Sequence, residues 1–430
     1  MSIRLYCSNL GRHIEVEGGT TLAQVAARVN LELGFSPICC RVNNKTEGLD
    51  YAVYSPKLIE FQSRTTGSGP RVYVRSLCMM LYSAVTALLP GVRLIIEHSI
   101  AHGHYCRLSG YSEVSEDTVE ALRDYIRNLV EQDIPFCRHE EQTDSVTALF
   151  EAEGLESKVE LLRTTRHLYT SYYTLGGVSD SYYGALAPST GLVDVFDLVK
   201  YKEGFLLMPF DPARPEVPAT PICQEKMYKA FTDYLRFNAI IGVSDVGQLN
   251  NCVLDNRVAD IINVAEALHE KSIAHISDEI TRRYHEGGAR IVLISGPSSS
   301  GKTTTTKRLA IQLMTNLLKP QMISLDDYFV DRIHTPRDES GDYDYESLYA
   351  LDLKQFNEDL SAVLRGEEVE LPSYNFELGC RQYRGNRIRL EEGSILLIEG
   401  IHGLNPELTG QIEERMKFRV YVSSLTTLKI

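Results

Sequence analysis

The chain of 430 residues has no apolar run that approaches the roughly 18 residues needed to cross a membrane. Its longest apolar runs are short, such as 291–294 and 395–398. The N-terminus also lacks the basic stretch and apolar core that mark a secretory signal. These absences predict a protein that is neither secreted nor anchored in a membrane.

The nine cysteines lack any C-x-x-C spacing, which favours reduced thiols over a disulfide framework and predicts a cytoplasmic location. Positive charge is also scarce, since 44 Lys and Arg face 58 Asp and Glu and the net charge is −14. This balance disfavours non-specific DNA binding and binding to anionic membranes. The hydrophobic content of 43% is ordinary for a globular protein, and the length predicts about three domains.

Three stretches mark predicted domain borders. Residues 64–70 are rich in turn formers, residues 209–221 carry five prolines and suit an extended connector, and Gly287-Gly288 ends a long helical pattern just before a strand. The fold class is therefore predicted as α/β. We divide the chain into a β-grasp domain, an α+β domain, a helical connector and a final domain with a parallel sheet, at residues 1–65, 71–221, 222–286 and 287–430.

The first domain is predicted from its order of elements. Strands are expected at 3–7 and 13–17 with a turn between them, and the capping box Thr21/Gln24 opens a helix that runs through Val29. Two more strands are expected, at 38–42 and 58–61. This order resembles a TGS domain, the ubiquitin-like module of threonyl-tRNA synthetases and some GTPases. The resemblance implies a docking module for an RNA or protein partner.

The second domain mixes helices and strands, expected at 77–89, 92–97, 116–132 and 205–208. It resembles the editing domain of threonyl- and alanyl-tRNA synthetases, in which an H-x-x-x-H is completed by a later C-x-x-x-H. His98 and His102 match the first pair, but Tyr182 and Leu186 stand where the later ligands belong. We therefore predict no intact metal site, and ordinary hydrogen-bonding roles for both histidines. The next segment is predicted as a long helix over 259–280, packed through an apolar stripe.

The clearest motif is G-x-x-x-x-G-K-[ST], which follows an apolar strand at 290–295 and precedes a helix predicted over 304–317. Glycines let backbone N–H groups curl around phosphates, and the helix N-terminus adds its dipole. Lys302 is expected to reach the terminal phosphates, and Thr303 to ligate Mg²⁺. The predicted ATP-binding residues are Gly296, Pro297, Ser298, Ser299, Ser300, Gly301, Lys302, Thr303 and Thr304.

Two acids follow later strands. Asp326 ends the strand predicted at 321–325, where a carboxylate faces the acceptor, so we expect it to act as a base or as a magnesium ligand. The neighbouring Asp327 is expected to be a solvated loop acid or a helix cap. Glu399 ends the apolar strand 394–399 and is expected to orient Mg²⁺.

A further segment could contact an acceptor. After a helix predicted at 353–364, a loop at 371–381 presents Tyr374 and Phe376, which offer flat faces to a base or sugar and could equally be core aromatics. The arginines that follow could supply cations, although their alternation favours a solvated strand edge. They are Arg381, Arg384, Arg387 and Arg389.

From Arg290 to Val422 these motifs, in this order, resemble the uridine kinase and phosphoribulokinase family of P-loop kinases. The family's acidic-aromatic segment is found at 342–352, its P-x-Y-x-F at 372–376 and its E-G-I at 399–401. The resemblance implies Asp326 as the base for a nucleoside 5′-hydroxyl, with Lys302 serving the phosphates and Thr303 and Glu399 serving Mg²⁺. It also implies acceptor contacts from Asp344, Tyr374, Phe376 and Arg381.

Two departures from the family pattern are visible. Uridine kinases usually carry a His three residues after the Phe of P-x-Y-x-F, where this chain has Gly379. The family also continues into an Arg-rich lid, whereas the sequence stops at Ile430, so we expect either a truncated domain or a domain without the lid.

The sequence thus predicts ATP-dependent, Mg²⁺-assisted phosphorylation of uridine or cytidine, by a protein that could form oligomers. A kinase for another hydroxylated metabolite is an alternative, as is an RNA- or tRNA-responsive NTP-binding regulator. A GTPase is disfavoured because no N-K-x-D motif follows the P-loop.

Overall fold

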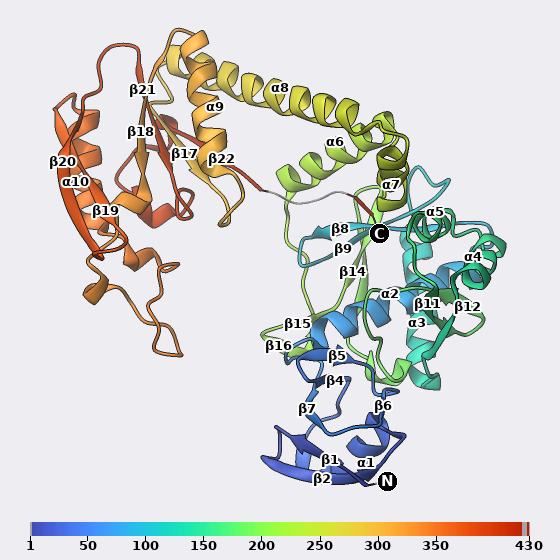
Figure 1. Ribbon diagram of the computed structural model, residues 1–430. Helices are drawn as coiled ribbons and strands as arrows, with labels where there is room; N and C mark the ends of the chain where they lie inside the picture. Colours follow the sequence, from blue (N-terminus) through green and yellow to red (C-terminus); the bar gives the residue numbers. More distant parts are fainter. Residues whose placement is uncertain (1, 424–427, 430) are drawn as a thin grey trace. The chain divides into compact units, whose positions relative to one another are not determined.

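A computed structural model describes residues 2–423 and 428–429 (Figure 1). The chain forms two compact units. One contains the residues up to Arg257 together with Lys429, and the other begins at Val258 and holds the P-loop. This division falls inside the segment 222–286. Within the described residues, no helix is long and apolar enough to cross a bilayer.

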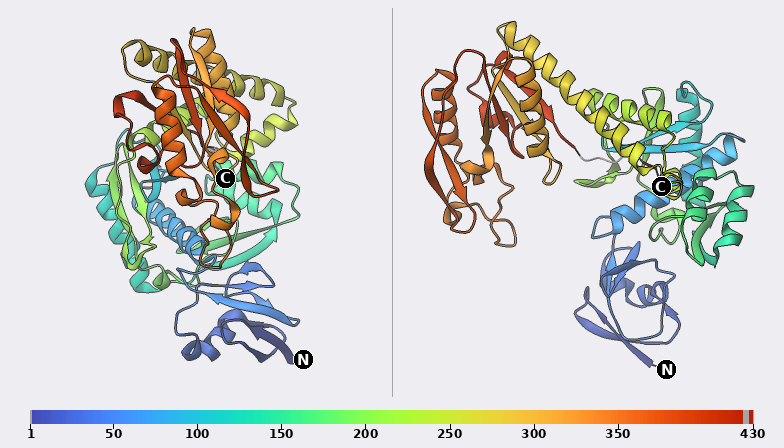
Figure 2. Two further views of the ribbon diagram at one scale, coloured as in Figure 1. Left: turned by 90° about the vertical axis from the view of Figure 1, so that its left-hand side faces the viewer. Right: turned by 45° about the horizontal axis from the view of Figure 1, so that its top comes forward.

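The N-terminal part of the first unit is a β-grasp, as predicted. Its mixed sheet has the strand order β2-β1-β7-β4-β5, with bounds Arg12–Glu17, Ser2–Cys7, Lys57–Gln62, Cys39–Val42 and Lys45–Glu47. The short strands β3 (Thr20–Thr21) and β6 (Ala52–Val53) pair beside it. Helix α1 (Leu22–Leu33) starts with the predicted capping box, in which Thr21 and Gln24 bond each other's backbone N–H groups. The N-terminal domain and its helix are seen again in Figure 2.

The rest of the first unit has a second, antiparallel sheet of order β13-β14-β9-β8, with bounds Asp197–Tyr201, Gly204–Met208, Gly103–Leu108 and Leu94–Ile100. A smaller sheet holds β10 (Cys137–Gln142), β11 (Tyr169–Leu175) and β12 (Val178–Asp180). The helices of this part are α2 (Gly69–Leu88), α3 (Glu116–Gln132), α4 (Thr143–Ala152) and α5 (Glu156–Thr164). The predicted bounds of α3 are confirmed.

Two predicted segments differ from the structure in this unit. The stretch 64–70 is not wholly a linker, because α2 already begins at Gly69 with Pro70 in its first turn, where a missing N–H costs nothing. The proline-rich stretch 209–221 contains the two-stranded ladder of β15 (Phe210–Asp211) and β16 (Arg214–Pro218). Helices α6 (Glu225–Ile241) and α7 (Val246–Leu254) complete the unit.

The second unit is built on a parallel sheet of order β18-β21-β17-β22. The strands span Lys319–Ser324, Ser394–Glu399, Ile291–Ser295 and Lys417–Tyr421. The two central strands are apolar except at their ends, because both faces of the sheet are covered. Pro320 lies in the edge strand β18, where a missing N–H is tolerated.

Alternate residues of the central strands enter two different cores. Leu293 and Leu396 pack in the core that includes α10 (Leu353–Leu364), whereas Val292 and Leu397 pack in the core with α8 (Val258–His285) and α9 (Lys302–Thr315). Each of these fully buried side chains contributes about 1.5–3 kcal/mol to folding. Helices α8 and α9 are in contact, and Figure 1 shows α9 at an angle to the longer α8, which extends well beyond it. Arg308 of α9 also pairs with Glu266 and Glu270 of α8.

The hairpin of β19 (Val369–Asn375) and β20 (Cys380–Ile388) lies near α10 in the second unit (Figure 1). The segment 371–381, predicted as a loop, is therefore mostly strand. Pro372 and the glycine near the turn suggested irregular structure. The strand that pairs with β19 begins after only four intervening residues, and this pairing makes the segment a hairpin.

Candidate active site

The P-loop connects the centre of the parallel sheet to the N-terminus of α9. At Gly296 a Cβ atom would lie 2.0 Å from the carbonyl oxygen of Val422, so the backbone leaves room only for glycine. Gly301 caps α9 with φ +85°, a left-handed conformation that side chains disfavour. The two glycines thus shape a loop whose N–H groups can surround a phosphate at the helix N-terminus.

The remaining predicted ATP-binding residues fall in this loop or in the first turn of α9. Ser299 has φ +59°, and the buried hydroxyl of Ser300 has no hydrogen-bond partner among the described residues. The helix starts at Lys302, two residues before the predicted start, and Thr304 lies in its first turn. The loop otherwise consists of Pro297 and Ser298.

Lys302 and Thr303 provide the polar side chains at the helix start. Lys302 Nζ donates to the carbonyl oxygen of Pro297 over 2.9 Å, which holds the amine against the loop. Thr303 Oγ1 donates to Glu399 Oε1 over 2.9 Å. A hydroxyl and a carboxylate are the hard oxygen donors that Mg²⁺ prefers, so these two side chains fit a magnesium ion.

Strand register explains why Glu399 reaches the P-loop. Glu399 is the last residue of β21 and lies opposite Ile294 of β17 on one side and Ser324 of β18 on the other. The carboxyl ends of three parallel strands therefore meet beside the loop, as expected for a ligand site in an open α/β sheet.

Asp326 lies directly after β18, in the 3₁₀ turn Leu325–Tyr328. The residue is exposed, yet partial desolvation by the surrounding protein raises the pKa of its carboxyl. The charge of Lys302 acts in the opposite direction, and Asp327 raises the pKa further. A carboxylate with a raised pKa is a better proton acceptor, which suits the predicted role of base.

Asp327 is not the solvated acid that was predicted. It is half-buried, and its Oδ1 accepts the backbone N–H of Tyr374 over 3.2 Å. Burial raises its pKa, while this bond and one from Ser373 lower it. The side chain thus ties the turn after β18 to β19, an arrangement hidden from the sequence because β19 comes about 47 residues later.

A second contact that sequence reasoning missed fixes the same turn. Tyr328 is fully buried, and its hydroxyl donates to Asp359 Oδ2 over 3.0 Å. Asp359, on α10, also accepts from Gln355 Nε2 over 2.8 Å. The sequence does carry a signal for this contact, because Asp359 lies one turn after Gln355 on the otherwise apolar face of α10.

Tyr374 and Phe376 lie in an aromatic cluster that we define as Phe329, Tyr345, Tyr374 and Phe376. The ring centroids of Tyr374 and Phe376 are 5.0 Å apart, and Phe329 lies 5.6 and 6.0 Å from them. Tyr374 is buried, whereas the ring of Phe376 is 57% exposed. The first is thus mainly a core residue, and the second keeps a face available for contact.

The other two predicted acceptor contacts have partners in the protein. Asp344 Oδ1 accepts the backbone N–H groups of Glu346 and Ser347 over 3.0 and 3.1 Å, which caps a local turn. Arg381 Nη2 lies 2.8 Å from Asp352 Oδ2 at the start of α10. Both side chains thus make a structural contact within the protein.

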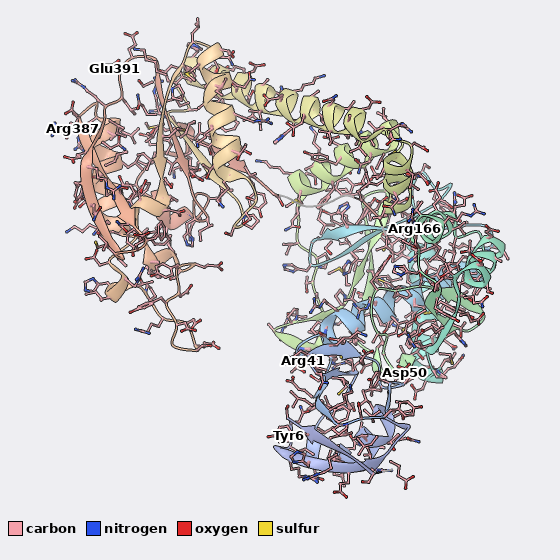
Figure 3. All side chains as sticks on the ribbon, viewed as in Figure 1. Tyr6, Arg41, Asp50, Arg166, Arg387 and Glu391 are labelled. Carbon is pink, nitrogen blue, oxygen red and sulfur yellow. The ribbon has the colours of Figure 1, made fainter. Side chains whose placement is uncertain are left out.

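The arginines further along β20 follow the solvated-edge interpretation. Arg387 is exposed and pairs with Glu368 over 3.0 Å. Figure 3 shows it on the outer edge of the hairpin. Arg384 donates to Gln382 on the same exposed surface.

His98 and His102 lie in different surroundings in the first unit. His98 lies on β8 and stacks on Phe231 with a centroid distance of 3.7 Å, while His102 lies in the following turn with φ +68°. Burial lowers the pKa of His98 to about 4. Over the residues that the structure describes, no group of three His, Cys, Asp or Glu could hold a metal ion. Leu186, at one position of the later pair, is a core residue.

Comparison with known proteins divides the chain in the same way. Residues 291–430 match the model of the phosphoribulokinase / uridine kinase family. The chain is 25% identical over 137 residues to uridine kinase of Halobacterium salinarum, which covers 32% of this chain and 57% of that protein. A solved structure titled a possible uridine kinase from Bacillus stearothermophilus shares 24% identity, with a TM-score of 0.28 and coverage of 34% of this chain and 79% of that one.

The N-terminal half is similar to a different enzyme. It is 26% identical over 188 residues to threonine–tRNA ligase of Rubrobacter xylanophilus, which covers 44% of this chain and 29% of the ligase. The chain thus spans less than a third of that ligase. These matches confirm the two resemblances seen in the sequence: the N-terminal half is homologous to threonine–tRNA ligases, and the C-terminal region is a P-loop kinase domain of the phosphoribulokinase / uridine kinase family.

Proposed function

We propose that the second unit transfers the γ-phosphoryl group of ATP to the 5′-hydroxyl of a nucleoside, uridine or cytidine, with Mg²⁺ as cofactor. The observation that carries this proposal is the meeting of Lys302, Asp326 and the Thr303–Glu399 pair at the carboxyl ends of parallel strands. Positioning and charge stabilisation account for most phosphoryl-transfer catalysis, and these residue types supply both.

In the proposed reaction the 5′-oxygen bonds to the γ-phosphorus as the bond from that phosphorus to the β–γ bridging oxygen breaks. Asp326 takes the proton of the hydroxyl, and ADP leaves with the bridging oxygen. Lys302 and the N-terminus of α9 stabilise the negative charge on the phosphates. A bound Mg²⁺ would neutralise further phosphate charge, held by Thr303 and Glu399.

We further propose that residues 1–65 act as a TGS-like docking domain and that residues 71–221 are derived from an editing domain. Residues 222–286 would connect them to the kinase-like domain. Homology to threonine–tRNA ligases supports an RNA or protein partner for this half. The same homology favours the second candidate, an RNA-responsive regulator that binds NTP without phosphorylating an acceptor.

Acceptor-stimulated ADP formation tests the proposal. ATP, Mg²⁺ and the protein are incubated with a panel of nucleosides and of other hydroxylated metabolites, and the Asp326→Asn variant serves as control. Stimulation by uridine or cytidine that disappears in the variant is the expected result. Stimulation only by another metabolite would select the alternative kinase, and tight ATP binding without any stimulation would select the regulator.

A further inference from the structure

Arg332 occupies the space beside the turn of the β19–β20 hairpin. Its backbone N–H donates to the carbonyl oxygen of Gly379 over 2.8 Å. A Cβ atom at Gly379 would lie 2.9 Å from both Cβ and Nε of Arg332 and 3.0 Å from its Cζ. Gly379 also has φ +69°. Glycine at this position therefore leaves the room that the Arg332 side chain fills.

The protein holds the Arg332 guanidinium by two contacts. Nε donates to the hydroxyl of Tyr345 over 3.2 Å, and Nη2 donates to the carbonyl oxygen of Phe376. A guanidinium has five N–H donors, so three remain. In the part of the chain that the structure describes, no protein acceptor pairs with these three.

These free donors lie next to a surface suited to a planar ring. Phe376, whose carbonyl oxygen Arg332 contacts, keeps 57% of its side chain exposed. The same aromatic cluster joins the turn that carries Asp326, because Phe329 ends that turn and Asp327 bonds to the backbone of Tyr374. A base stacked on Phe376 would thus have Arg332 near its edge.

A guanidinium donates hydrogen bonds and accepts none. It pairs with a ring carbonyl oxygen and repels a ring amino group at the same position. Uracil and cytosine differ in this way at ring position 4, where uracil has a carbonyl and cytosine an amino group. At N3 the difference is reversed, because uracil has an N–H there and cytosine a lone pair, so the preference for uridine applies to a guanidinium that meets position 4. A single charged hydrogen bond of this kind discriminates by about tenfold or more.

We propose that Arg332 is a specificity-determining residue that reads this carbonyl oxygen, so that the site prefers uridine over cytidine. The inference rests on the proposed function, since it assumes a nucleoside acceptor. It extends that function in two ways: Arg332 lies outside the sequence motifs, and it would make the site favour one of the two pyrimidines.

The test is the ratio of kcat/KM for uridine to that for cytidine, measured with Mg²⁺ and ATP. The unmodified protein is expected to prefer uridine by about tenfold or more. Arg332→Gln should bring the ratio close to one, because an amide carries both a donor and an acceptor and can rotate to suit either base. Arg332→Lys keeps only donors and should keep the preference for uridine.

Arg384→Gln is the matched control, because Arg384 is an exposed arginine of the same hairpin, and its ratio should equal that of the unmodified protein. Melting curves establish that each variant is folded, and if the glutamine variant is not, the ratio in the unmodified protein decides. A ratio near one in the unmodified protein, or an unchanged ratio in Arg332→Gln, would overturn the inference and leave the nucleoside kinase standing. Failure to phosphorylate either nucleoside would overturn both.

Discussion

At the scale of single residues, the account depends on the environment of Asp326. Desolvation raises the pKa of this carboxyl, and Lys302 only partly offsets the effect. The ionised form is the one that accepts a proton, so activity should fall as pH falls through the pKa of Asp326. That acid limb should lie above the pKa of an ordinary aspartate.

The same shift predicts a change in stability. Between the ordinary pKa, which applies in the unfolded chain, and the raised pKa of the folded protein, only the folded state retains the proton. Stability therefore decreases as pH rises through this window, and the ionised carboxylate still destabilises the fold at neutral pH.

Asp326→Asn should accordingly lower the rate of phosphoryl transfer by about 10²–10⁴-fold while slightly raising the melting temperature at pH 7. Steady-state kinetics and calorimetry measure the two effects. Glu339→Gln, which removes an exposed acid from the same unit, is the control and should change neither. A variant that loses activity only because it melts earlier would contradict the assigned role.

Some of these residues could be predicted from the sequence because they lie next to contiguous patterns. Thr303, Asp326 and Glu399 each lie next to a strand or loop that can be recognised from consecutive residues in the sequence. Asp327 and Arg332 could not be predicted in the same way. Their roles depend on pairing with the hairpin β19–β20, whose position in space no local pattern of residues specifies.

At the scale of elements, the turn Leu325–Tyr328 is the part of the site that needs most support. The hydroxyl of Tyr328 meets Asp359 of α10 in a buried position, and Asp352, the cap of α10, donates its N–H to the carbonyl oxygen of Tyr328 over 2.8 Å. Two bonds thus connect α10 and its cap to the turn that carries Asp326.

Tyr328→Phe should lower the free energy of unfolding of this unit by about 1–3 kcal/mol, because Asp359 loses one of two partners while buried. Urea unfolding measures the loss, and the transition that ATP with Mg²⁺ shifts identifies the unit. Tyr349→Phe is the matched control. Its hydroxyl meets Glu407 on the surface, so its effect should be near zero. Equal changes in the free energy of unfolding for the two variants would show that the buried hydrogen bond stabilises the unit no more than the exposed one.

Elements with strong local signals were predicted well. The bounds of α3 and α10 match the predictions, since each has a capping residue at the start and an apolar stripe. The hairpin and the start of α2 were missed because proline and glycine suggested breaks there. Pairing between β19 and β20 formed the hairpin, and packing of the helix set the start of α2.

At the scale of the whole molecule, the two units have different relatives, and the predicted chemistry belongs to the second. In the first unit His98 stacks on Phe231, and burial lowers its pKa to about 4. We predict that the purified protein carries well under one equivalent of zinc, and that a chelator leaves its melting temperature unchanged in the absence of nucleotide. Elemental analysis measures this. One equivalent of zinc that disappears in His98→Ala would contradict the prediction.

The most direct test of the central claim is to identify the product of the reaction. Uridine, ATP and Mg²⁺ are incubated with the protein, and phosphorus NMR follows the mixture. The account predicts a 5′-phosphate monoester of uridine that forms together with ADP and is absent with Asp326→Asn. ATP binding without any nucleoside ester, with both uridine and cytidine, would contradict it.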